Sequence, residues 1–163
     1  MSQTRFINPQ ALGKPPGYTH VVEVTAPGRI VYIAGQLGVD RDGKVVGDFR
    51  RQAVQTFENL KTALAAVGAE FRHVVKLNNY LVDRAHLPTF REVRDSYLAE
   101  NDRPASTTIA ISGLAREGAL IEIEAVAMVP AARSQAASKA ASKPAGKGRT
   151  ARAARRTSRP RRK

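Results

Sequence analysis

Cysteine is absent from this chain of 163 residues. The chain can therefore form no disulfide and can use no thiolate for catalysis. Its three histidines, His20, His73 and His86, lack the short spacings typical of metal ligands, so no metal site is expected. No apolar run approaches the roughly 20 residues that cross a bilayer, and the N-terminal segment lacks the apolar stretch of a secretory signal. We expect a cytoplasmic protein without membrane contact.

Acidic residues are missing from the C-terminal fifth of the chain. Residues 131–163 hold 12 of the 27 lysines and arginines and none of the 14 acidic residues. The first 130 residues carry 15 basic and 14 acidic residues, a net charge of +1, against +13 for the whole chain. The C-terminal segment also has no aromatic or large aliphatic residue, so it cannot offset its ordering entropy by burial. The sequence predicts a folded body at 1–130 and a disordered basic tail at 131–163.

The basic tail favours non-specific contact with nucleic acid. Such binding depends on counterion release and falls steeply with salt. Base-specific recognition is not expected, because the tail has no aromatic side chain to stack on bases. A solubilising appendage is the alternative. The candidate contacts are the arginines Arg149, Arg152, Arg155, Arg156, Arg159, Arg161 and Arg162.

The body begins with a pattern of strands and then changes to a helical period. THVVEVTA (19–26) and RIVYIAG (29–35) flank Pro27-Gly28, which is typical of a hairpin. Asp48 is a candidate N-cap and Gly68 a candidate stop for the helix that follows. The buried face of this helix is predicted by apolar residues three and four apart, namely Phe49, Ala53, Phe57, Leu60 and Leu64.

The second half of the body repeats the alternation of strand and helix. HVVKLNNYLVD (73–83) is rich in β-formers, and TFREVRDSYLAE (89–100) predicts a helix in which Thr89 and Glu92 have the spacing of a capping box. ASTTIAISG and LIEIEAVAM are expected to be two strands joined by a turn near Arg116. In the last strand, Glu122 and Glu124 alternate with apolar residues and would lie on one face.

The element order ββαβαββ predicts an α+β fold, with two helices on one face of a mixed sheet. The other face needs cover as well, because RIVYIAG carries apolar residues on both of its faces. No further element remains in the body to cover that face. We therefore expect the protein to associate with copies of itself.

Several short segments, in this order and spacing, resemble the Rid family, also called YjgF or L-PSP. The resemblance spans about residues 7–130, and its segments are PGYTHVVEV, IVYIAGQLGVD, QTFENLKTALAAVGA, VVKLNNYLVD, RPAST and IEIEAVA. It implies a chorismate-mutase-like fold and a homotrimer with small-molecule clefts between adjacent subunits. It also implies hydrolysis of reactive imines and enamines to a ketoacid and ammonia, without a cofactor.

The resemblance implies a set of site residues, with one departure. Glu122 corresponds to the glutamate that helps to place the attacking water, and Tyr18, Gly35 and Gln36 correspond to residues that line the cleft. Ser106 stands where the family has the arginine that holds the substrate carboxylate. Because a guanidinium makes two charge-assisted hydrogen bonds and a hydroxyl only one weaker bond, this change should cost affinity.

Arg94, at the position of a common pocket asparagine, is a candidate to compensate for Ser106. The alternatives at these positions are structural. Arg94 would then be an exposed helix charge paired with a neighbour, Glu122 a solvated strand residue, and Tyr18 a core or interface aromatic. Glu124 is expected to be a salt-bridge or interface residue, and Ser106 a hydrogen-bond donor, not a nucleophile.

Two functions remain open from the sequence. The first is deamination of imines or enamines, or binding of a related small metabolite, in clefts between subunits. The second is a non-catalytic ligand-binding protein tethered to nucleic acid by its tail. An endoribonuclease, a label carried by some family members, is disfavoured, because the body lacks the histidine or lysine constellation usual for RNA cleavage.

Overall fold

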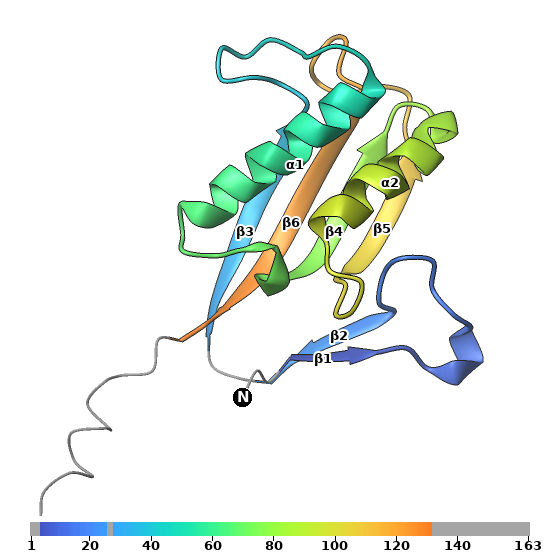
Figure 1. The fold of residues 1–163 in the computed structure, drawn as a ribbon, viewed down its shortest axis with the longest axis vertical. Helices are drawn as coiled ribbons and strands as arrows, with labels where there is room; N and C mark the ends of the chain where they lie inside the picture. Colours follow the sequence, from blue (N-terminus) through green and yellow to red (C-terminus); the bar gives the residue numbers. More distant parts are fainter. Residues whose placement is uncertain (1–3, 26–27, 132–163) are drawn as a thin grey trace, which may run out of the picture. The chain divides into compact units, whose positions relative to one another are not determined.

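The computed structural model describes residues 4–25 and 28–131. Figure 1 shows the strands and helices in their order along the chain. The helices are α1 (Phe49–Ala65) and α2 (Leu87–Tyr97), with 3-10 turns η1 (Gln10–Leu12), η2 (Phe71–His73) and η3 (Arg84–His86). The strands are β1 (Thr4–Ile7), β2 (Val21–Val24), β3 (Gly28–Leu37), β4 (Val74–Leu81), β5 (Ala105–Ala110) and β6 (Ile121–Pro130).

Helix α1 forms where the helical period of apolar residues predicts it. The side chain of Asp48 accepts a hydrogen bond from the backbone N–H of Arg51 at 3.0 Å, so Asp48 is the N-cap. All five residues of the predicted face are buried, and burial of such a side chain contributes roughly 1.5–3 kcal/mol. The stripe on α1 therefore packs the helix onto the sheet.

Helix α2 begins at Leu87, and the predicted capping box of Thr89 and Glu92 is wrong. The carboxylate of Asp83 accepts a hydrogen bond from the N–H of Ala85 at 2.8 Å and begins η3, which leads directly into α2. Pro88 occupies the first turn of α2. Proline suits this position because its missing N–H would have had no partner there.

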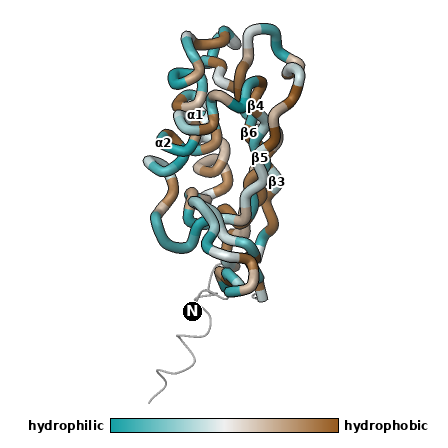
Figure 2. Tube along the Cα trace, turned by 90° about the vertical axis from the view of Figure 1, so that its right-hand side faces the viewer, coloured by the Kyte–Doolittle hydropathy of each residue, from teal (hydrophilic) through white to brown (hydrophobic). Residues whose placement is uncertain are grey.

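The four-stranded sheet has the order β3-β6-β4-β5. Strands β4 and β5 are parallel, and β6 is antiparallel to both β3 and β4, so the sheet is mixed as expected. Both helices cover one face of this sheet, as the front and side views show (Figures 1 and 2). The predicted α+β class is confirmed, with β1 as an additional strand.

The predicted strand neighbours are wrong at both ends of the body. Strand β2 pairs with β1 in a separate two-stranded sheet, not with β3. Strands β5 and β6 are not neighbours either, since β4 lies between them. The reason is the length and composition of β6. It offers β3 ten residues with an apolar helix-facing side, whereas β2 has only four residues.

The side chains of β6 alternate between the two faces of the sheet. Its residues Ile121, Ile123, Ala125, Ala127 and Val129 are buried under the helices. The intervening residues, which include Glu122 and Glu124, are half-buried on the opposite face. We call this opposite side the open face.

The open face carries large apolar side chains that the described part of the chain leaves uncovered. Tyr32 of β3 is 78% exposed, Ile30 is 56% exposed, and Ile109 of β5 is 46% exposed. The strand register places Tyr32 and Ile30 opposite Val126 and Met128, so all four residues share this face. A patch of this kind marks an interaction surface.

Candidate functional site

A β-bulge in β3 determines the surroundings of Glu122. The register advances by three residues in β3, from Ile33 to Gln36, but by only two in β6, from Ala125 to Ile123. The bulge brings the backbone of Gly35 against the Glu122 side chain. A Cβ at position 35 would overlap the Glu122 carboxylate. Glycine is therefore required at position 35 if this carboxylate is to keep its place.

The pKa of the Glu122 carboxylate is raised above its ordinary value. Burial raises its pKa, and the charge of Glu124 on the same face raises it further. A carboxylate with a raised pKa takes up a proton more readily than an ordinary surface glutamate, which suits a general base.

Glu124 is held in place by two hydrogen-bond donors from β4. The Tyr80 hydroxyl donates to Glu124 Oε2 at 3.0 Å, and Asn78 Nδ2 donates to the same oxygen at 3.3 Å. The bond to Glu124 raises the pKa of Tyr80, because ionised tyrosine could no longer donate it. Glu124 is therefore bonded to its own sheet, and Glu122 is the member of the pair without a protein donor among the described residues.

Three of the sequence-predicted site residues line a second location, a cavity of about 370 Å³ between α2 and β5. We call it the arginine cavity. Tyr18, Arg94 and Ser106 contribute to its wall. The remaining lining residues are Pro16, Leu81, Arg84, Leu87, Arg91, Thr107, Thr108, Ile109 and Ala110.

Arg94 is buried, which contradicts the interpretation of an exposed helix charge. Only 4% of the residue is exposed. Its Nε and Nη2 both lie 2.8 Å from Asp95 Oδ1, and the Arg103 guanidinium lies 2.7 Å from the same oxygen. Gly17, at φ +86°, lets the chain pass directly against Arg94, where any Cβ would overlap the guanidinium. The intrahelical partner was predicted, but the burial was not.

Ser106 lines the arginine cavity next to the buried amide of Asn79. Asn79, 1% exposed, donates from Nδ2 to Ser106 Oγ at 2.9 Å, so this oxygen already acts as an acceptor. The same amide group donates to the Thr107 carbonyl at 2.9 Å and to Thr108 Oγ1 at 3.1 Å. The Ser106 hydroxyl can therefore donate to a ligand, as a hydroxyl is both donor and acceptor.

The predicted site residues fall into two sets that lie on opposite faces of the sheet. Ser106 is in register with buried Leu77, on the helix side, whereas Glu122 is in register with Tyr80, on the open face. Strand β4 also lies between them. Gly35 belongs with Glu122. Gln36 lies at the end of the bulge, where its Nε2 donates to the Ala34 carbonyl at 3.0 Å.

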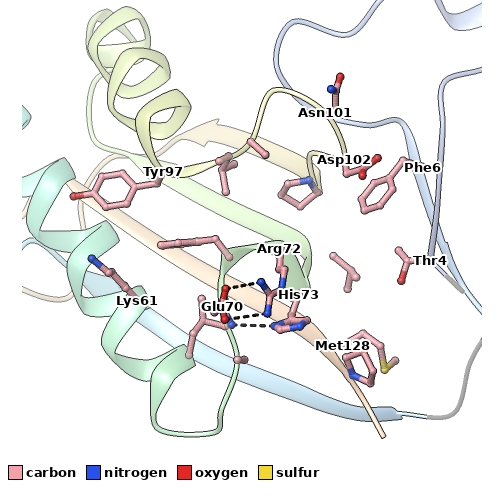
Figure 3. A pocket seen from close by; sticks show the side chains of 18 of the residues that line it. Thr4, Phe6, Lys61, Glu70, Arg72, His73, Tyr97, Asn101, Asp102 and Met128 are labelled. Carbon is pink, nitrogen blue, oxygen red and sulfur yellow. Dashed lines mark hydrogen bonds and ion pairs between the residues drawn. The ribbon is translucent and has the colours of Figure 1, made fainter. Parts of the chain in front are cut away.

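A larger cavity of about 850 Å³ contains none of these residues (Figure 3). Three of its polar residues, Glu70, Arg72 and His73, bond to one another. Arg72 donates to the Glu70 carboxylate at 3.0 Å, and His73 Nδ1 accepts from the Glu70 N–H at 3.0 Å. Burial lowers the pKa of His73, so its ring is neutral at neutral pH. These groups satisfy one another and do not indicate a ligand.

Two further properties bear on the chemistry available to the described residues. In residues 4–25 and 28–131, no three histidine, aspartate or glutamate side chains converge as metal ligands. Over the same residues, no helix is both long and apolar enough to cross a membrane. The seven tail arginines lie outside the described residues, so their contact with nucleic acid stays a prediction, as do the domain bounds.

Sequence reasoning missed two residues of the arginine cavity, Arg84 and Arg91. Together with Arg94 they are spaced seven and three residues apart, which is a helical spacing. That spacing was a usable signal, but the expected helix began at Thr89 and left Arg84 outside it. Because η3 runs into α2, all three arginines reach one cavity.

The fold and the two sets of residues define a class of small α+β domains, and comparison with known proteins identifies the family. Residues 9–129 match the family model described as Endoribonuclease L-PSP. A crystal structure of a Rid-family protein of unknown function from Yersinia pestis superposes with a TM-score of 0.68 at 35% identity, covering 78% of this chain and 99% of that one. The chain belongs to this family, which is also called the Rid or YjgF family.

Curated relatives carry the names of deaminases. A 2-iminobutanoate/2-iminopropanoate deaminase of Mus musculus is 34% identical over 74% of this chain and 84% of its own length. The 3-aminoacrylate deaminase RutC of Acinetobacter baylyi is 34% identical over 72% of this chain and 93% of its own length. Protein DfrA of Myxococcus xanthus is 36% identical over 74% of this chain and 88% of its own length.

Proposed function

We propose that this protein hydrolyses reactive imines and enamines to the carbonyl compound and ammonia, in clefts shared between neighbouring subunits of a homotrimer. The observation that carries the proposal is the Glu122 carboxylate, held against the Gly35 backbone with a raised pKa. Relatives at 34% identity named as imine and aminoacrylate deaminases support the same chemistry.

The shared cleft follows from the separation of the two sets of residues. Within one chain, Glu122 and Ser106 lie on opposite faces of the sheet, with β4 between their strands. One small substrate cannot touch both from a single copy. In a cyclic oligomer, however, the open face of one copy can meet the arginine cavity of the next. The uncovered Tyr32 and Ile30 favour such a contact, since association would bury them.

The reaction needs only a positioned water and a protonated imine. Glu122 accepts a proton from the water as its oxygen attacks the C=N carbon, which forms a tetrahedral aminoalcohol. Glu122 then gives this proton to the nitrogen, the C–N bond breaks, and ammonia leaves as the C=O bond forms and the hydroxyl proton returns to Glu122. An enamine would first be protonated at carbon and follow the same path.

The arginine cavity would hold the substrate carboxylate. Arg94 is buried and shares the Asp95 carboxylate with Arg103, so the pair of guanidiniums retains a positive charge. The Ser106 hydroxyl, which lines the same cavity, supplies a second donor. Together they replace the single arginine that the family uses at position 106. Neither set of site residues contains histidine or lysine, so RNA cleavage has no support here.

An imine-hydrolysis assay on the full chain tests this function. An amino-acid oxidase generates a 2-imino acid in the cuvette, and semicarbazide traps what survives. We expect the protein to lower the trapped fraction and Glu122→Gln to lose at least about a hundredfold in rate, within the usual range for a general base. Glu117→Gln, an exposed loop carboxylate, is the matched control and should keep full activity. Equal activity of the parent and Glu122→Gln would remove Glu122 from the mechanism.

A further inference from the structure

All of the charged side chains that line the arginine cavity are positive. Arg84, Arg91 and Arg94 contribute to its wall, and its lining contains no aspartate or glutamate. The opposite wall comes from β5, where Ser106 and Thr108 carry hydroxyl groups on the helix side of the strand. The hydroxyl of Thr107 accepts from Lys76 Nζ at 2.7 Å instead. The cavity volume of about 370 Å³ lies within the range of about 300–1,000 Å³ usual for small-molecule pockets.

The nearby acids do not neutralise these charges. Asp95 is shared by Arg94 and Arg103, so those three groups keep one positive charge. Glu92 pairs with Arg50 of α1, and Asp83 accepts from the Ala85 N–H. Within the described residues, neither Arg84 nor Arg91 forms an ion pair with an acidic side chain. The charged side chains that line the cavity are therefore all positive, and Asp83, outside the lining, is the nearest carboxylate in the sequence to Arg84.

A ligand with a single carboxylate would pair with only part of the positive charge that lines the cavity. A single guanidinium already binds a carboxylate with two parallel hydrogen bonds, so one carboxylate leaves the other arginines of the cavity wall without an anionic partner. Arg91 and Arg94 are three residues apart on α2 and share one helix face. Arg84 and Arg91 are exposed to solvent, whereas Arg94 is buried. A ligand with an anionic group at each end would bind Arg94 with one end and Arg84 and Arg91 with the other.

We propose that this cavity selects 2-imino acids that carry a second anionic group, a carboxylate or a phosphate. Arg94 and Ser106 bind the carboxylate next to the imine, and Arg84 and Arg91 bind the distal anion. Two-electron oxidation of the amino group of an acidic or phosphorylated amino acid, as an amino-acid oxidase or dehydrogenase performs it, is the class of reaction that supplies such substrates. Turnover of them rests on the proposed function, but the preference for a dianion is a property of binding.

Calorimetry on the full chain tests this preference with ligands that lack the imine. 2-Oxoglutarate and 2-oxopentanoate share five carbons and differ by the distal carboxylate, and phosphohydroxypyruvate provides the phosphate arm. At least one dianion should bind about tenfold or more tightly than 2-oxopentanoate, the difference expected for one added charge-assisted contact. The arm that shows the gain identifies the distal group.

Matched arginine variants assign the effect to the cavity. Arg91→Gln and Arg84→Gln should each remove most of the preference for the dianion. Arg41→Gln removes the same charge from a side chain that is 93% exposed in the loop before α1, and should leave the preference intact. Equal affinity for all three ligands, no measurable binding of any, or a preference that survives both cavity variants would overturn the proposal.

A kinetic arm separates this inference from the proposed function. The imine of L-glutamate should have a lower KM than the imine of L-norvaline, and Arg91→Gln should raise KM for the former alone. If neither imine is hydrolysed but the dianion still binds more tightly, the deaminase proposal fails and the ligand class stands. If both imines are hydrolysed with equal KM, the deaminase stands and the ligand class fails.

Discussion

Glu122 and Glu124 are two residues apart on one strand, but their surroundings differ. Glu124 receives hydrogen bonds from Tyr80 and Asn78. Glu122 lies against the Gly35 backbone, and its pKa is raised first by burial and then by the charge of Glu124. Hydrogen bonding therefore fixes Glu124, whereas burial, and to a smaller extent the neighbouring charge, makes Glu122 a better base.

Glu124→Gln should shift the low-pH limb of the activity profile to lower pH. Glu122 works as a carboxylate, so activity falls as pH drops through its raised pKa. Removing the charge of Glu124 lowers that pKa, and Glu122 then stays ionised in more acidic solution. Glutamine keeps a carbonyl oxygen to accept from Tyr80. The measurement is kcat/KM of imine hydrolysis against pH.

Glu124→Asp is the control for that shift, because it keeps the charge. The low-pH limb of the Glu124→Asp activity profile should stay close to that of the parent protein. A Glu124→Gln profile that falls at the same pH as the parent would show that Glu124 does not tune Glu122.

At the scale of the element, α1 shows that the helical spacing of apolar residues predicts which face of a helix is buried. Its apolar stripe and Asp48 cap are visible in the sequence, because spacing and capping are local properties. The strand neighbours were not predictable in this way. Apart from β1, which was not predicted, each strand was located close to its true position, but the pairing of β3 with β6 joins residues about a hundred positions apart in the chain. Hairpin signals at Pro27-Gly28 and near Arg116 pointed to closer partners.

Leu60→Ala should destabilise the protein far more than Val54→Ala. Both residues lie on α1, but Leu60 is fully buried in the core and Val54 is 40% exposed. Deleting a buried leucine side chain costs about 2–5 kcal/mol, whereas an exposed substitution costs about 0.5 kcal/mol. Urea unfolding of the full chain, at one protein concentration, measures the difference. Similar losses in the two variants would contradict the packing of this helix face.

The sequence supplied candidate site residues, without Arg84 and Arg91, but not their arrangement. The sequence resemblance singled out Glu122, Tyr18 and Ser106 by position. The burial of Arg94 depends on Gly17, which is 77 positions away and meets it only in the folded chain. The division of the site between two sheet faces depends on the order of the strands. Both features are long-range, so local pattern could not supply them.

For the whole molecule, the open face predicts the state of assembly. Tyr32→Lys should convert a trimer to monomers, because it places a charge where a 78% exposed tyrosine would be buried between copies. Leu12→Lys is the matched control, since Leu12 is 60% exposed on η1 and lies outside this face. Sedimentation equilibrium of the full chain measures the mass. A monomeric parent, or a trimer unaffected by Tyr32→Lys, would contradict assembly through this face.

Mixing two inactive variants tests the central claim, a deaminase site completed by two subunits. Glu122→Gln and Arg94→Met would each be inactive alone, because each removes one set of the site. After partial unfolding and joint refolding, random trimers contain some clefts with an intact Glu122 from one subunit and an intact Arg94 from its neighbour. About a quarter of the clefts should be complete, so about a quarter of the parent imine-hydrolysis rate should return. No recovery from a mixture shown by mass to contain mixed trimers would mean that each site lies within one chain.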